Sequence, residues 1–139
     1  MLLMGQNEVQ KFIQENNIKH FQVKEFVCKH CGEVIIESEL LKILEELRNF
    51  LGKPVIITSA YRCIEHNRAI GGVPGSAHIR GYAVDVKALN SNTRFRIVKF
   101  LLDHGITRIG IAETFIHFDL DPEKPKNVIW HYFKHSHVA

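Results

Sequence analysis

Histidine and aspartate residues recur at two places in the second half of the chain. His78 precedes Asp85 by seven residues, and His117 and Asp119 alternate within FIHFDL (115–120). Imidazole nitrogen and carboxylate oxygen are common ligands of Zn²⁺, and three protein ligands leave a fourth position for water. Zinc lowers the pKa of bound water toward ~7, which makes it a nucleophile at neutral pH. His78, Asp85 and His117 therefore predict a catalytic zinc site, although spacing alone also fits packed, hydrogen-bonded histidines.

Two strands must position these side chains. In a strand alternate residues share a face, so His117 and Asp119 lie on one face of 115–120 while the other face is apolar. We expect this strand to be central in its sheet. The segment 82–87 also alternates, and Gly81 lets the backbone bend between His78 and Asp85, so that both side chains can converge on one point.

The remaining elements follow from periodicity and from stop signals. We expect helices at about 7–16, from a Ser38 cap to Gly52, at 65–70 and at 92–104, strands at 54–61 and 108–112, and a loop at 71–81. No assignment is made after residue 120. Strands joined by hairpins and flanked by helices favour an α+β fold with a central, mostly antiparallel sheet.

Composition limits the class of protein. The chain has 139 residues, of which 45% are hydrophobic and 24% charged, so disordered chains and disulfide-rich miniproteins are excluded. We expect one domain over residues 1–139. No apolar run reaches the roughly 20 residues of a membrane span, and residues 1–10 lack a secretory signal pattern, so we expect synthesis in the cytoplasm. The net charge of +3, with scattered Lys and Arg, argues against a nucleic-acid partner.

Two long segments carry a family resemblance. TSAYRCIEHNRAIGGVPGSAHIRGYAVDV (58–86), followed by IGIAETFIHFDL (109–120), resembles the zinc D-Ala-D-Ala carboxypeptidase family. Relatives of that family include phage L-alanyl-D-glutamate endopeptidases, D-Ala-D-Ala dipeptidases and the hedgehog signalling domain. The resemblance runs from about Phe21 to Leu120 and implies a hedgehog/DD-peptidase-like fold. It also implies zinc-dependent hydrolysis of peptidoglycan stem peptides.

The resemblance assigns roles to residues. His78, Asp85 and His117 match the zinc ligands of the family. Arg62 matches an arginine that binds substrate and polarises the scissile carbonyl, a task that suits a permanently charged, forked donor. The alternative for Arg62 is a surface arginine paired with Glu65.

The general base is less well defined by the family pattern. Some relatives carry an acid three residues before the strand histidine, where this chain has Thr114 with Glu113 one position earlier. Others carry histidine two residues before it, where this chain has Phe115. Asp119 is a second candidate base, or it orients a ligand or Arg62. If neither Glu113 nor Asp119 reaches the water, the chain is an inactive metal binder.

Three cysteines leave several interpretations open. Cys28-Lys-His-Cys31-Gly resembles a zinc knuckle, to which Cys63 and either His66 or His30 could add ligands for a second, structural zinc. A disulfide between Cys63 and one of the other two is an alternative, as are three reduced thiols. The odd count excludes a fully paired disulfide framework.

Other polar and aromatic residues receive structural roles. His66 and Asn67 are expected to cap the short helix and hold the glycine-rich loop, which Ser76 shapes. Trp130 and Tyr132 are expected to pack in the core, and the alternative is that they line a cleft. The histidines of the C-terminal segment are expected to be exposed; they are His131, His135 and His137.

These observations predict a zinc metallopeptidase of the D-Ala-D-Ala carboxypeptidase type that acts on the bacterial cell wall after release from a bacterial or phage-infected cell. Two alternatives stay open. One is L-alanyl-D-glutamate endopeptidase activity at the same site, and the other is a non-catalytic, hedgehog-like zinc-binding module. A zinc-knuckle nucleic-acid module is disfavoured by the modest charge.

Overall fold

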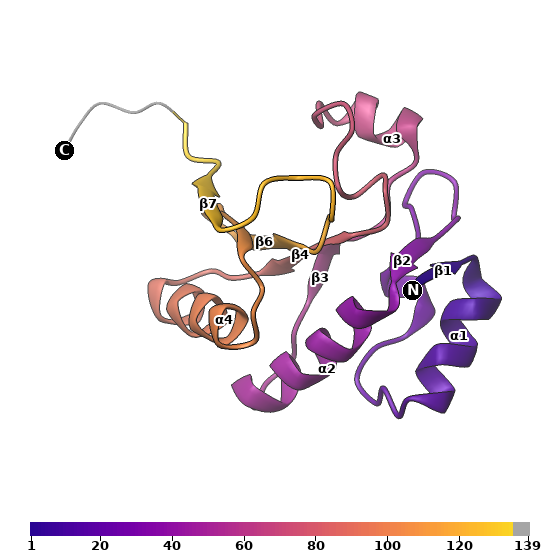
Figure 1. The fold of residues 1–139 in the computed structure, drawn as a ribbon, viewed down its shortest axis with the longest axis horizontal. Helices are drawn as coiled ribbons and strands as arrows, with labels where there is room; N and C mark the ends of the chain where they lie inside the picture. The colour runs from indigo at the N-terminus through magenta and orange to yellow at the C-terminus, as the bar shows by residue number, and fades with distance from the viewer. Residues whose placement is uncertain (135–139) are drawn as a thin grey trace.

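The computed structural model describes residues 1–134. Four α-helices, one 3-10 turn and seven strands follow each other in these residues (Figure 1). In chain order they are β1 (Leu2–Met4), α1 (Gln6–Glu15), the turn η1 (Val23–Glu25), β2 (Ile35–Glu37), α2 (Ser38–Leu51), β3 (Ile57–Ser59), α3 (Ile64–Ala69), β4 (Ala83–Lys87), α4 (Ser91–Asp103), β5 (Arg108–Ile111), β6 (Phe115–Asp119) and β7 (Val128–His131). The predicted α+β class is confirmed.

The main sheet has five strands in the order β3-β4-β6-β5-β7. All neighbours are antiparallel except β5 and β7, which pair in parallel. β6 is the middle strand, as its apolar face predicted. A separate two-stranded sheet joins β1 to β2.

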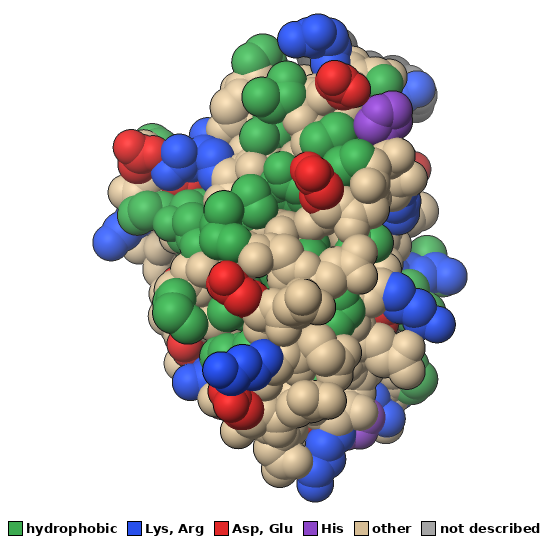
Figure 2. All heavy atoms as spheres, turned by 90° about the vertical axis from the view of Figure 1, so that its right-hand side faces the viewer, with side chains coloured by type: hydrophobic (Ala, Val, Ile, Leu, Met, Phe, Trp, Pro, Cys, Tyr) green, Lys and Arg blue, Asp and Glu red, His purple; other side chains and the backbone are tan. Residues whose placement is uncertain are grey.

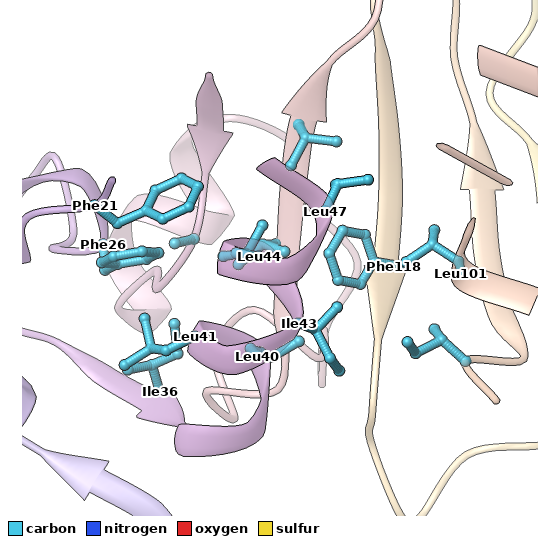
Figure 3. Packing of buried hydrophobic residues seen from close by; sticks show 14 of the residues in the cluster. Phe21, Phe26, Ile36, Leu40, Leu41, Ile43, Leu44, Leu47, Leu101 and Phe118 are labelled. Carbon is cyan, nitrogen blue, oxygen red and sulfur yellow. The ribbon is translucent and has the colours of Figure 1, made fainter. Parts of the chain in front are cut away.

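The core lies on one face of the main sheet. Ile116 and Phe118 of β6 are fully buried there, beneath α2 and α4. Figure 3 shows the Phe118 ring between Leu47 of α2 and Leu101 of α4. Because these apolar residues alternate with His117 and Asp119, the opposite face of β6 is left for polar groups.

Some predicted elements differ from the observed ones. The strand predicted at 54–61 is shortened to β3, which pairs only with β4, so this edge position leaves Ile56 50% exposed. Ser38 is the first residue of α2 and not its cap, because the Glu37 side chain accepts the Ser38 backbone N–H. β1 and β7 were not predicted, since they are short and gain their hydrogen bonds from partners distant in sequence, while β2 lies in a segment, 21–37, that was expected only to hold extended stretches and turns.

The surface mixes side chains of all types. Figure 2 views the side on which α1 lies, where hydrophobic side chains gather among separate acidic and basic ones. Among the described residues, no helix has both the length and the apolar character needed to cross a bilayer.

Candidate active site

Three polar side chains meet on the face of the sheet opposite the core. Asp85 of β4 and His117 of β6 are direct partners in the strand register, and His78 comes from the loop that precedes β4. The Asp85 Oδ1 atom lies 2.9 Å from His117 Nδ1 and 3.2 Å from His78 Nε2. The three residues are only 3–5% exposed, and their ligand atoms all lie within 4.8 Å of one another.

The second nitrogen of each imidazole has its own acceptor. His78 Nδ1 lies 2.7 Å from the Ala60 carbonyl oxygen, and His117 Nε2 lies 2.7 Å from Asp119 Oδ2. A carbonyl oxygen only accepts, so in the neutral His78 ring Nδ1 donates and Nε2 keeps its lone pair. Histidines that bind metals are held in this way, with the free N–H on a carbonyl or carboxylate. The donor set of two oriented imidazoles and one carboxylate fits Zn²⁺.

The charges at this site are strongly coupled. Burial opposes ionisation of Asp85, but hydrogen bonds from His117 and His78 hold its pKa well below the usual range. Burial lowers the pKa of His117, but Asp119 and Asp85 outweigh it and raise that pKa. Without metal, the two carboxylates therefore favour the protonated form of the His117 ring.

Asp119 has partners for both of its carboxylate oxygens. Oδ2 accepts from His117, while Oδ1 accepts from Arg108 Nε at 2.7 Å and from the Asp121 backbone N–H at 3.1 Å. Burial opposes ionisation of Asp119, and the bonds from His117 and Arg108 nevertheless lower its pKa. This carboxylate therefore has no free oxygen in the described arrangement.

Glu113, the other predicted acid, lies elsewhere. It sits in the turn between β5 and β6 with an exposed side chain, and its backbone carbonyl accepts a hydrogen bond from Arg94 at 2.7 Å. It is not among the residues that line the cavity described below, whereas Asp119 is.

Arg62 reaches the same centre from the segment after β3. Its Nε donates to Ser59 Oγ at 3.0 Å, one terminal nitrogen donates to Asn67 Oδ1 at 3.1 Å, and the other lies 3.5 Å from Asp85 Oδ2. The alternative pairing with Glu65 is wrong, since the Glu65 carboxylate lies beside His30 at 3.4 Å.

Asn67 joins Arg62 to the glycine-rich loop. It is buried, and its Nδ2 donates to the Val73 carbonyl at 2.9 Å while its oxygen accepts from Arg62. Ser76 is also buried, and its hydroxyl oxygen accepts the His78 backbone N–H at 3.2 Å. The predicted roles of Asn67 and Ser76 in shaping this loop agree with these contacts.

A cavity of about 510 Å³ opens over the three residues. Its wall includes Trp130 and Tyr132. The expected core packing of these residues is wrong and the cleft alternative agrees with the structure, because β7 adds to the edge of the sheet beside β5. Their rings lie 5.3 and 6.4 Å from the His117 ring. His131 is exposed as predicted, and His135 and His137 lie outside the described residues.

Sequence reasoning missed several residues of this cavity. Arg108 was not considered, although its guanidinium joins Asp119 to the Trp130 ring, 5.0 Å away. Lys124 at the cavity edge, which donates to the Gly75 carbonyl, was also missed. The alternation of Trp130 and Tyr132 was a usable signal for a strand with an aromatic face.

Comparison with protein families gives a match. A family model described as Peptidase M15 matches residues 19–119, well over half of the chain. No curated protein gives a match. The matched range contains Arg62 and the group of His78, Asp85 and His117, and it ends before β7.

Proposed function

Because the chain belongs to the Peptidase M15 family, whose members are zinc-dependent metallopeptidases, we propose that it hydrolyses peptide bonds in the stem peptides of peptidoglycan. The observation that carries this proposal is the convergence of His78, Asp85 and His117 at the floor of a cavity. Three buried ligands of this kind are typical of a catalytic zinc site, because they leave a position for water or substrate.

Each residue of the proposed site has a task. His78 Nε2, His117 Nδ1 and an oxygen of Asp85 would hold the zinc, which when bound supplies an activated water and polarises the substrate carbonyl. Arg62, fixed by Ser59 and Asn67, directs positive charge to the same place. Its guanidinium stabilises the negative charge that develops on the carbonyl oxygen as the bond is attacked.

Of the two predicted acids, we assign Asp119 to the reaction. Asp119 lines the cavity and binds His117, while Glu113 does neither. Its first task is to orient His117 by accepting the hydrogen bond that the His117 Nε2–H donates. Asp119 could take a proton from water only after one of its oxygens left Arg108 or His117, so it is a positioning residue in the described arrangement.

The cavity suits a peptide that carries carboxylates. Its volume of about 510 Å³ lies within the range of small-ligand sites. Arg62, Arg108 and Lys124 supply positive charge along its wall, and Trp130 and Tyr132 supply flat apolar surface. Peptidoglycan stem peptides combine small apolar alanines with free carboxylates, which is the chemistry that these walls would bind.

The test is hydrolysis of defined stem peptides by the zinc-loaded protein, followed by mass spectrometry of the products. Loss of a terminal D-alanine would support the carboxypeptidase, and cleavage between L-alanine and D-glutamate would support the endopeptidase. The His117→Ala variant should lose activity, whereas His104→Ala, at the exposed end of α4, should keep it. If the protein is fully loaded with zinc and still forms no product, the proposed peptidase activity is wrong and the non-catalytic zinc-binding module is favoured.

A further inference from the structure

Three cysteine side chains meet in a second cluster that the proposed reaction does not use. Cys28 and Cys31 belong to the loop between η1 and β2, and Cys63 is the residue before α3. In the described residues all three thiols are free, and their sulfur atoms lie within 4.8 Å of one another. Cys28 is buried, so the cluster extends from the interior to the surface.

The loop that carries the first two cysteines has the form of a zinc knuckle. Two residues separate Cys28 from Cys31, and Gly32 follows with a φ of +76°, a conformation that favours glycine. The Gly32 N–H donates to the Cys28 carbonyl at 2.8 Å, and the Cys28 N–H donates to the Glu33 carbonyl at 2.7 Å. This tight turn presents both sulfurs to the same side.

Backbone N–H groups are directed at the sulfurs. The Cys63 N–H lies 3.4 Å from Cys28 Sγ, and the His66 N–H lies 3.4 Å from Cys63 Sγ. Donors in this position stabilise a thiolate, which is the form of cysteine that binds a metal. These hydrogen bonds support metal binding by the cluster over an incidental proximity of three thiols.

Only the three sulfur atoms lie within 4.8 Å of one another, so a fourth ligand has to come from a neighbouring side chain that turns toward them, and His66 is our candidate. Cys63 caps α3 and His66 follows three residues later, so both project from the first turn of the same helix. The His66 ring stacks against His30 of the knuckle, with ring centres 6.3 Å apart. His30 itself lies within the turn between the two cysteines and is directed at Glu65.

We propose that Cys28, Cys31, Cys63 and His66 form a second, structural zinc site. Four protein ligands would close the coordination sphere, as in structural and not catalytic zinc sites. The site would clamp the knuckle to the segment that carries Arg62, next to Cys63. Two contacts already join these parts: Lys29 Nζ donates to the Thr58 carbonyl at 2.7 Å, and the Tyr61 N–H donates to the Phe26 carbonyl at 3.3 Å.

Cobalt substitution tests the ligands. Co²⁺ occupies tetrahedral zinc sites, and thiolate ligands add a sulfur-to-cobalt charge-transfer band that the His78, Asp85 and His117 site cannot give. The metal-free His117→Ala variant should bind about one Co²⁺ per chain with this band. This experiment tests the cysteine site independently of the proposed active site, because a protein without peptidase activity would still show the charge-transfer band.

Substitutions at His66 test the fourth ligand. His66→Ala should weaken cobalt binding by at least about tenfold, since even an outer hydrogen-bond partner of a ligand is commonly worth that much. His66→Cys should retain tight binding and strengthen the charge-transfer band. His30→Ala is the matched control and should bind cobalt as the parent does; a loss there with normal binding in His66→Ala would overturn the assignment of His66.

Thiol labelling of the unmodified chain tests the site without any substitution. Zinc should slow alkylation of all three cysteines, with the protection measured for each residue by peptide mass spectrometry. Equal labelling with and without zinc, or two cysteines joined in a disulfide after purification under reducing conditions, would overturn the proposal.

Discussion

His117 is the residue on which the proposed site depends most. Its ring lies between the carboxylates of Asp85 and Asp119, at 2.9 and 2.7 Å, and it is almost fully buried. One nitrogen is thereby assigned to the metal position and the other to a fixed acceptor. The ring orientation is set before any metal binds, which reduces the cost of forming the site.

Asp119→Asn tests whether that acceptor positions His117 or moves protons itself. Asparagine keeps the shape but has only one acceptor oxygen, so it cannot serve both His117 and Arg108. We expect zinc affinity to fall about 10–100-fold and hydrolysis to recover when zinc is raised to saturation. Zinc titration and kcat with and without excess zinc measure the two effects.

Glu113→Gln is the control for this experiment. Its side chain is exposed and outside the cavity, so zinc affinity and hydrolysis should both stay at the parent level. An Asp119→Asn protein that holds zinc fully and yet stays inactive would contradict the positioning role and favour direct proton transfer. If the Glu113→Gln protein is inactive, Glu113 and not Asp119 acts as the general base.

At the scale of elements, the site is built by β4, β6 and β7 in different ways. The first two place ligands by strand alternation, while β7 and the residue after it place Trp130 and Tyr132 over the ligands. This is possible because Gly110 of β5 lies opposite both His117 and Trp130 in the strand register. A Cβ at Gly110 would lie 2.6 Å from Trp130 Nε1 and 2.7 Å from Tyr132 Cε2.

Gly110→Ala should therefore displace the aromatic wall. We expect a loss of roughly 1–3 kcal/mol in the free energy of unfolding, as for other overpacked sites. Trp130 is the one tryptophan of the chain, so its fluorescence reports the position of β7 directly. The emission should shift to longer wavelength as the indole becomes more exposed, and urea unfolding gives the stability.

Gly105→Ala separates strain from displacement. Gly105 has a φ of +76° with open space around its Cβ position, so alanine there strains the backbone far from the cavity. It should lower stability without altering the tryptophan emission. If Gly110→Ala leaves both emission and unfolding unchanged, β7 does not pack as tightly as described.

At the scale of the whole molecule, the metal-free site makes stability depend on pH. The raised pKa of His117 adds stability that is fully present below its unfolded value of about 6.5 and is lost as pH rises through the folded value. The lowered pKa values of Asp85 and Asp119 add stability that is lost only as pH falls through those values. The metal-free protein should thus lose stability from neutral toward alkaline pH.

Zinc should reverse that loss, because it replaces the proton on His117 and binds more tightly as that proton leaves. The rise in Tm on adding zinc should be larger at about pH 8 than at about pH 6. Thermal unfolding of metal-free and zinc-loaded protein over this range measures it. In His117→Ala the difference between the two rises in Tm should be smaller. If zinc raises the Tm of the parent equally at both pH values, zinc binding is not linked to the loss of the His117 proton.

Local pattern predicted much of the fold and the centre of the site. Ile116 and Phe118 alternate with His117 and Asp119, and strand geometry alone then separates a core face from a polar face. The apolar period of α2 and its Gly52 stop depend on neighbours within a few residues. For such features the sequence carries the whole physical cause, so it determined the α+β class and the middle strand. The three candidate ligands followed from their residue types together with the family resemblance.

Only the tertiary structure decided what surrounds those ligands. The Arg108 contact with Asp119 depends on the register of β5 against β6, and the position of Trp130 depends on a parallel pairing with β5 that no nearby residue specifies. The exposure of Glu113 follows from a turn that directs it away from the cavity. Contacts of this kind join residues far apart in the chain, so they stabilise the protein only once the sheet has formed. They cannot be predicted from residues that are neighbours in sequence.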